Sequence, residues 1–261
     1  MKRVSLLDRR HFLRVTTATA GVGLLASTPF AKTASLFKIR AIAFDAFAVL
    51  DPRPVFSLAE TLFPERGLEL SNEWRTRQFE YTWLRTLSGR YADFWNVTED
   101  ALNFAAKKTD IDLSQEQSLR LMNAYLGLKP WPDVVPILHA LREEGIRMAL
   151  LSNFTEGMLI SCIKNSGLNG IFERILSTDQ VKAFKPDPRA YGMGVNALNL
   201  SREEILFVAF AGWDAAGSKI FGYPTYWVNR FNLPPEELGA PVDGTGIDLK
   251  ELLHFIRSRN L

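Results

Sequence analysis

The chain of 261 residues is long enough for one α/β domain with an inserted subdomain and a sizeable buried core. Hydrophobic residues make up 47% of it and charged residues 23%, which is typical of a globular protein. The formal net charge is +2, and the lysines and arginines are interspersed with acidic residues, which excludes a basic groove for nucleic acid.

Residues 1–34 have the pattern of an export signal. Arg9 and Arg10 are adjacent, and a mildly apolar run follows over residues 15–26. A basic segment before a modest apolar run is typical of a secretory signal, and paired arginines are typical of the twin-arginine route. We therefore expect a periplasmic protein that binds the twin-arginine export machinery and is cleaved near residue 34. An uncleaved anchor and a basic tail without a targeting role are the alternatives.

The first strand-like segment follows this signal. Residues 40–45 form an apolar run that ends in Asp45, which predicts a buried strand with a carboxylate at its C-terminal end. Residues 52–132 contain no strand-like run and show helical periodicity over 72–87, 98–107 and 114–125. A helical insertion at this point would cover the carboxyl ends of the strands as a cap that excludes water.

The remainder of the chain alternates between strand-like and helix-like runs. The strands are expected over 147–153, 175–177, 205–210 and 225–228, and the helices over 133–144, 156–165, 188–198 and 249–257. This alternation predicts an α/β fold, a Rossmann-like parallel sheet flanked by helices with an inserted helical cap. The core domain would comprise residues 35–51 and 133–261, and the cap would comprise residues 52–132.

Polar side chains follow three of these strands. Ligands of open parallel sheets bind at the carboxyl ends of the strands, which is where the sequence places Asp45, Ser152, Asn153 and Asp214. We therefore predict an active site at this edge of the sheet.

Cysteine and histidine are scarce. Cys162 is the single cysteine and falls on the apolar face of a predicted helix, so we expect a buried, inert thiol. His11 lies in the predicted signal, and His139 and His254 lie in predicted helices. None of them has the spacing of a metal pair, and none follows a strand. The pattern disfavours zinc hydrolysis and a Ser-His-Asp triad, which leaves carboxylate chemistry.

The order of these motifs resembles the haloacid dehalogenase superfamily and, within it, the type II L-2-haloacid dehalogenases. The matching segments are Asp45, the helical insertion with Glu80-Tyr81-Thr82-Trp83-Leu84-Arg85, Leu151-Ser152-Asn153, Ala183-Phe184-Lys185-Pro186-Asp187 and Gly212-Trp213-Asp214. The resemblance covers nearly all of the chain after residue 34. It implies a hydrolase that acts on the carbon–halogen bond of a small 2-halo acid, uses no cofactor and forms a homodimer.

Two positions distinguish this branch from the magnesium-dependent phosphatases of the superfamily. The phosphatases carry a second acid two residues after the nucleophile, where this chain has Phe47. They also carry a magnesium ligand four residues before the acid of the last motif, where this chain has Phe210. Because a hard cation needs several oxygen ligands, we expect no metal site.

The resemblance implies a covalent mechanism. Asp45 would displace halide from the substrate carbon and form an aspartyl ester, which water would hydrolyse to the 2-hydroxy acid with inverted configuration. Lys185 would neutralise Asp45, Asp214 would activate the water, and Arg75 would reach from the cap to the substrate and the departing halide. The residues that the resemblance implies for substrate binding are Ser152, Asn153, Tyr191, Phe47, Phe79, Phe94 and Trp213.

Several neighbouring positions depart from the family pattern. The family has Tyr-Gly-Thr where this chain has Phe47-Ala48-Val49, and Ser-Ser-Asn where it has Ala209-Phe210-Ala211. Carbon thus replaces groups that would hydrogen-bond the aspartate and the water, and loss of one such donor costs about 10²- to 10³-fold in rate.

Three hypotheses remain. They are an active periplasmic dehalogenase with a more apolar site, a weak or inactive relative that binds a small organic acid, and a phosphatase, against which Phe47 and Phe210 argue.

Overall fold

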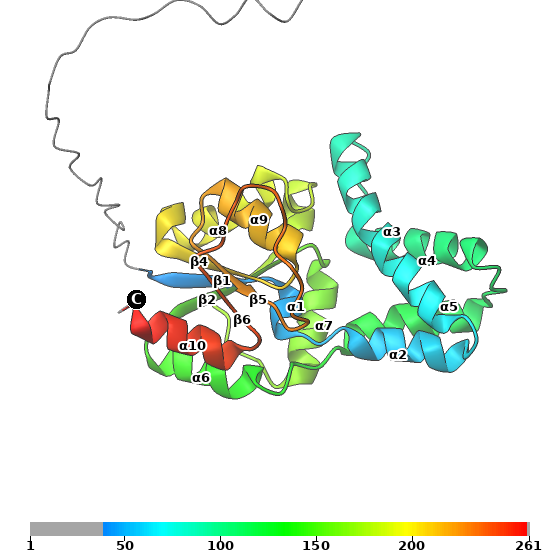
Figure 1. Cartoon of the computed structure of the whole chain (residues 1–261), viewed down its shortest axis with the longest axis horizontal. Coiled ribbons are helices and arrows are strands. Elements are labelled where there is room, and N and C mark those ends of the chain that lie inside the picture. The colour runs from blue at the N-terminus through cyan, green and yellow to red at the C-terminus, as the bar shows by residue number, and fades with distance from the viewer. Residues whose placement is uncertain (1–38, 260–261) are drawn as a thin grey trace, which may run out of the picture. The chain divides into compact units, whose positions relative to one another are not determined.

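The computed structural model describes residues 39–259, so the predicted export signal lies outside the described residues. Within them, six strands form one parallel sheet in the order β3-β2-β1-β4-β5-β6. Helices connect the parallel strands across both faces of the sheet (Figure 1), which confirms the Rossmann-like α/β prediction. The strands are β1 (Ala41–Phe44), β2 (Arg147–Ser152), β3 (Arg174–Ser177), β4 (Ile205–Ala209), β5 (Thr225–Val228) and β6 (Gly244–Gly246).

The central strand β1 is buried on both faces. Its side chains alternate, so that Ile42 and Phe44 pack in one apolar cluster and Ala41 and Ala43 pack in another. The first cluster includes residues of α6 (Val134–Glu143), α7 (Glu156–Ser166) and α10 (Leu249–Ser258). The second includes residues of α8 (Pro188–Leu198) and α9 (Gly212–Phe221). Figure 1 shows α8 and α9 on one side of the sheet and α6 and α10 on the other.

Local signals set the ends of several helices. α7 ends before Gly167, which adopts a left-handed φ of 73°. α10 begins after Asp248, whose carboxylate accepts hydrogen bonds from the backbone N–H groups of Lys250 and Glu251. The predicted strands and helices of the core all occur. Helix α9 and strand β6 were not predicted, and β6 consists of Gly-Thr-Gly at the edge of the sheet.

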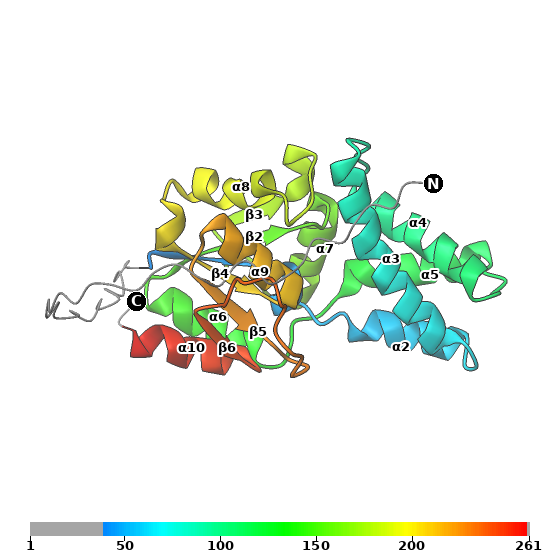
Figure 2. The same cartoon turned by 45° about the horizontal axis from the view of Figure 1, so that its top comes forward.

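Helices also fill the predicted cap range, and Figure 2 shows them side by side. They are α2 (Arg53–Leu62), α3 (Gly67–Leu87), α4 (Phe94–Lys108) and α5 (Gln115–Ala124). Helix α2 was not predicted, and α3 and α4 begin earlier than the periodicity indicated. Gly67 starts α3 where a Cβ atom would overlap the backbone of Ala59 and Glu60 in α2. Glycine therefore permits the sharp reversal between these two helices.

Two adjacent segments connect the helices α2–α5 to the sheet. Leu50 and Pro130 form an antiparallel bridge, and the N–H groups of Asp51 and Trp131 donate to the carbonyls of Lys129 and Val49 at 2.8 and 3.1 Å. The chain thus leaves and re-enters the core side by side. The boundaries at residues 52 and 132 stay a prediction. No helix among residues 39–259 has the length and apolarity needed to cross a bilayer.

Candidate active site

Asp45 lies directly after β1, at the carboxyl edge of the sheet. Its backbone N–H donates to the carbonyl of Val208 on β4 at 2.9 Å. Its Oδ2 accepts a hydrogen bond from the N–H of Phe47 at 2.9 Å and thereby caps the short helix α1 (Ala46–Val49). Its Oδ1 accepts one from Lys185 Nζ at 2.8 Å. Both oxygens of this carboxylate therefore have fixed directions.

Lys185 supplies the positive charge of the site. Its side chain is 1% exposed, and Nζ donates to Asp45 Oδ1 and, at 2.7 Å, to Asp214 Oδ2. Burial opposes the ammonium charge, but the two carboxylates outweigh burial and raise the pKa of Lys185 above its usual value. One ammonium group thus lies between two acids, and the three groups together carry one negative charge.

Asp214 comes from the first turn of α9 and is buried. Tyr191 donates its hydroxyl to Asp214 Oδ1 at 2.7 Å. The pKa of Asp214 is raised to about 6: burial is the largest cause and nearby Asp45 acts in the same direction, while Lys185 and the Tyr191 hydroxyl act against them. A carboxylate with this pKa is ionised at neutral pH and can accept a proton, as a general base requires.

Ser152 and Asn153 extend from the end of β2. Asn153 Oδ1 accepts hydrogen bonds from the backbone N–H of Lys185 at 2.9 Å and from Thr178 Oγ1 at 3.3 Å. With its oxygen engaged, the amide nitrogen of Asn153 is available to a ligand. Ser152 Oγ accepts from the N–H of Phe154 at 3.1 Å, which leaves its hydroxyl hydrogen to donate. Together they offer donors suited to an anion.

A small space, the inner cavity, lies among these groups. Its volume of about 20 Å³ holds roughly one water molecule. Aromatic rings form much of its wall, with the Phe47 and Phe94 centroids 5.1 and 5.2 Å from that of Phe154. The lining residues are Asp45, Phe47, Phe79, Phe94, Ser152, Asn153, Phe154, Lys185, Phe210, Ala211, Trp213 and Asp214.

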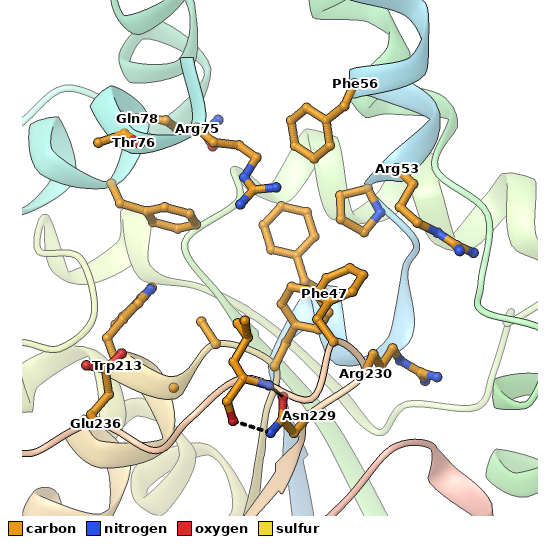
Figure 3. A pocket seen from close by; sticks show the side chains of 17 residues that line it. Phe47, Arg53, Phe56, Arg75, Thr76, Gln78, Trp213, Asn229, Arg230 and Glu236 are labelled. Atoms are coloured by element: carbon orange, nitrogen blue, oxygen red, sulfur yellow. Dashed lines mark hydrogen bonds between the residues drawn. The ribbon is translucent and has the colours of Figure 1, made fainter. Parts of the chain in front are cut away.

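A larger space, the outer pocket, adjoins the inner cavity and has a volume of about 280 Å³ (Figure 3). Arg75 of α3 directs its guanidinium group into this pocket, 5.1 Å from the ring centroid of Phe56. The lining residues are Phe47, Pro52, Arg53, Phe56, Arg75, Thr76, Gln78, Phe79, Phe210, Ala211, Gly212, Trp213, Asn229, Arg230, Phe231, Leu233 and Glu236.

The structure brings most of the predicted site residues to the inner cavity, and two lie elsewhere. Arg75 lines the outer pocket instead. Tyr191 is fully buried, donates its hydroxyl to Asp214 and lines neither space.

Some lining residues were not predicted. Phe154 follows the Ser152-Asn153 pair directly, which is a signal that could have found it. Phe56 belongs to the unpredicted helix α2. Asn229 to Glu236 follow β5 in an irregular segment that carries no local signal.

The charged groups of the inner cavity are two carboxylates and one ammonium group. In the part of the chain that the structure describes, no three His, Cys, Asp or Glu side chains cluster as metal ligands. The position between the two carboxylates belongs to the ammonium of Lys185, and the nearby side chains of Phe47 and Phe210 provide no oxygen. The donor set suits an organic anion better than a hard cation.

The family model, the relatives and the solved structures that resemble this chain are all haloacid dehalogenases or hydrolases like them. Residues 36–222 match the family model of haloacid dehalogenase-like hydrolases. Haloacetate dehalogenase H-2 of Moraxella sp. is 40% identical over 220 residues, 84% of this chain and 98% of the relative. The crystal structure of an L-2-haloacid dehalogenase is 39% identical with a TM-score of 0.83, covering 84% of this chain and 99% of that one. The structure of L-2-haloacid dehalogenase from Xanthobacter autotrophicus with chloropropionic acid covalently bound is 31% identical, with a TM-score of 0.76. The match covers 84% of this chain and 98% of that one.

Proposed function

The chain belongs to the haloacid dehalogenase-like hydrolases, and we propose that it hydrolyses L-2-haloacids through an ester on Asp45, without a metal ion. One observation carries this proposal. Asp45, at the carboxyl end of β1, is held by Lys185, which also binds Asp214 beside a cavity walled by aromatic rings. A fixed carboxylate in a water-poor site is suited to attack carbon.

The first step forms the ester. An oxygen of Asp45 bonds to the α-carbon of the haloacid as the carbon–halogen bond breaks, and the halide leaves with the bonding electron pair. In-line attack inverts the configuration at that carbon. The donors of Ser152 and Asn153 bind the substrate carboxylate, and the guanidinium of Arg75 stabilises charge on the side of the outer pocket.

The second step releases the product. A water molecule adds to Cγ of Asp45 and passes a proton to Asp214, whose pKa of about 6 allows it to act as a base at neutral pH. The bond from Cγ to the ester oxygen then breaks, and the departing alkoxide takes the proton back from Asp214. The remaining proton leaves the regenerated carboxyl of Asp45 for solvent, which yields the 2-hydroxy acid.

A second candidate function is a weak or inactive relative that binds a small organic acid. Carbon groups at Phe47, Phe210 and Ala211 line the inner cavity, where the family pattern has hydroxyl and amide groups. Both oxygens of Asp214 are already hydrogen-bonded, to Tyr191 and to Lys185. If these features impair ester hydrolysis, Asp45 would react once and remain esterified.

Halide release from (S)-2-chloropropionate distinguishes the two candidates. We expect steady release by the wild-type protein with a chelator present, and none by the Asp45→Asn variant. A single stoichiometric burst, with a propionate ester located on Asp45 by peptide mass spectrometry, would favour the second candidate. No release and no ester would contradict the dehalogenase proposal.

We also propose periplasmic localisation, export by the twin-arginine machinery and assembly as a homodimer. The paired Arg9 and Arg10 support the first two proposals. Support for a dimer comes from the family and from exposed leucines on α3, where Leu84 and Leu87 are 57% and 85% exposed. Light scattering on the purified protein tests the dimer.

A further inference from the structure

The inner cavity is too small for a haloacid. At about 20 Å³ it has room for roughly one water molecule, while the outer pocket beside it offers about 280 Å³. Five residues line both spaces, so the two spaces share one wall, formed by Phe47, Phe79, Phe210, Ala211 and Trp213. A substrate whose α-carbon reaches Asp45 therefore has to extend toward the outer pocket.

The polar donors indicate which end of the substrate faces inward. Ser152 and Asn153 line the inner cavity only, so the substrate carboxylate belongs there. The substituent on the α-carbon then points through the shared wall. Ala211 is the smallest side chain of that wall, so the wall is thinnest in side-chain bulk at this position. The outer pocket is thus the space that the substituent enters.

The outer pocket has the chemistry of an aromatic binding site. Phe56, Phe79, Trp213 and Phe231 contribute rings, and apolar side chains bind apolar ligands by excluding water. The lining also includes charged residues: Arg53 and Arg230 pair with Asp51 and Asp133, and Glu236 and Arg75 complete the set. Among residues 39–259 no carboxylate lies within ion-pair distance of Arg75, and its guanidinium group stacks over the ring of Phe56. A planar cation and aromatic walls both favour another ring.

We propose that the outer pocket holds an aromatic substituent of the substrate, so that the chain favours 2-halo acids such as 2-bromo-3-phenylpropionate over 2-bromopropionate. This inference rests on the proposed dehalogenase function. It adds a substrate class to that function and makes the outer pocket the region that determines specificity.

Filling the outer pocket tests the inference. Thr76 of α3 lines this pocket and not the inner cavity, and its Oγ1 donates to the carbonyl of Asn72 at 2.9 Å. Thr61 of α2 makes the equivalent bond to the carbonyl of Ser57 at 2.8 Å and lines neither space. Thr76→Trp therefore fills the pocket, and Thr61→Trp is a matched control on an exposed helix face.

The readout is the ratio of kcat/KM for (S)-2-bromo-3-phenylpropionate to that for (S)-2-bromopropionate. We expect the wild-type ratio to be about 10 or more, since apolar groups in a pocket discriminate by about 10- to 200-fold. Thr76→Trp should lower the ratio about tenfold, and Thr61→Trp should leave it within about twofold. A wild-type ratio below one, or an unchanged ratio in Thr76→Trp, would overturn the inference.

A binding measurement separates this inference from the proposed function. Calorimetry with the Asp45→Asn variant compares 3-phenylpropionate with propionate, and neither acid can be dehalogenated. Tighter binding of 3-phenylpropionate that Thr76→Trp abolishes would support the outer pocket even if no substrate releases halide. Equal affinity for the two acids would overturn the inference even if dehalogenation is confirmed.

Discussion

Lys185 lies between two carboxylates that would repel each other without its charge. Its ammonium group contacts Asp45 at 2.8 Å and Asp214 at 2.7 Å, and its side chain is almost fully buried. Its positive charge offsets the repulsion between the two carboxylates and holds Asp214 close to Asp45. Both effects depend on a charge that no apolar side chain can replace.

Replacing Lys185 with methionine should therefore lower stability and activity together. Two buried acids lose their shared cation, and removing one partner of a buried ion pair costs about 3–5 kcal/mol in the free energy of unfolding. Urea unfolding and halide release measure the two effects. The Lys185→Met/Asp214→Asn double variant should recover part of the stability but no activity. A Lys185→Met protein as stable as the wild type would contradict this role.

Asp214 should give ester hydrolysis an acid limb. Its carboxyl has a pKa of about 6 in the free protein, where the charge of Asp45 helps to raise it. The ester removes that charge, so we expect the rate to fall as the pH drops through a value below 6, where Asp214 is protonated and cannot accept the proton of water. The Tyr191 hydroxyl stabilises the ionised form, so Tyr191→Phe should raise the pKa and move the midpoint to higher pH. Single-turnover rates across this range measure the shift.

Tyr223 provides the control for this shift. Its hydroxyl donates to the backbone carbonyl of Tyr191 and not to Asp214, so Tyr223→Phe should leave the midpoint unchanged. Equal midpoints in the wild-type and Tyr191→Phe proteins would show that the Tyr191 hydroxyl does not set the pKa of Asp214.

At the scale of elements, Asp133 joins segments that lie far apart in the chain. It precedes α6, accepts hydrogen bonds from Arg230 at 2.8 and 3.0 Å, and accepts one from the N–H of Leu249 at the start of α10. Arg230 also donates to the carbonyl of Ala48 in α1. This pair fixes the segment after β5, which lines the outer pocket, against the helices beneath it.

Asp133→Asn should lower the free energy of unfolding by about 3 kcal/mol, because the side chain of Arg230 would remain buried without its counter-charge. Burial opposes the charge of Asp133, but Arg230 and the Leu249 N–H lower its pKa below the usual value. The Asp133–Arg230 pair therefore stabilises the folded protein fully above the ordinary pKa of an aspartate. This stabilisation is lost as the pH falls through the lowered pKa of Asp133 in the folded protein.

Urea unfolding at neutral and acidic pH checks both parts of this prediction. Glu173→Gln, which breaks an exposed pair with Arg147, is the control and should cost less than about 1 kcal/mol. A destabilisation by Asp133→Asn no larger than that of this control, or an equal difference from wild type at both pH values, would contradict the role of the Asp133–Arg230 pair.

At the scale of the whole molecule, the active site depends on the sheet order. Strand β1 lies between β2 and β4, with Phe44 in register with Leu150 and Val208, so residues from distant segments meet at one edge. The helices of the predicted cap add Phe79 and Phe94 to the same cavity. Residues at the edge of the sheet and residues of the predicted cap helices therefore line the same inner cavity.

The export proposal also concerns the whole molecule. Replacing both Arg9 and Arg10 with lysine should retain the protein in the cytoplasm, because the twin-arginine route depends on the arginine pair and not on charge alone. Fractionation of cells that express the two forms measures this. Equal amounts of both forms in the periplasm would contradict the proposal.

Strands, helix ends and several site residues could be predicted from the sequence, because each depends on residues that are close together in the chain. Apolar runs predicted the five longer strands, and Asp248 and Gly167 are residue types that typically begin and end helices. The acid at the end of β1 and the phenylalanines at positions 47 and 210 were also visible without a structure. These signals are local, because capping and burial on a central strand act over a few residues.

Packing between distant segments sets which side chains share a space. It places Arg75 in the outer pocket, Tyr191 against Asp214, and the segment after β5 at the pocket wall. It also forms β6 from Gly-Thr-Gly, a sequence with little intrinsic strand preference, by pairing it with β5. These placements result from packing between segments that are distant in sequence, and no local pattern encodes the distance between such side chains.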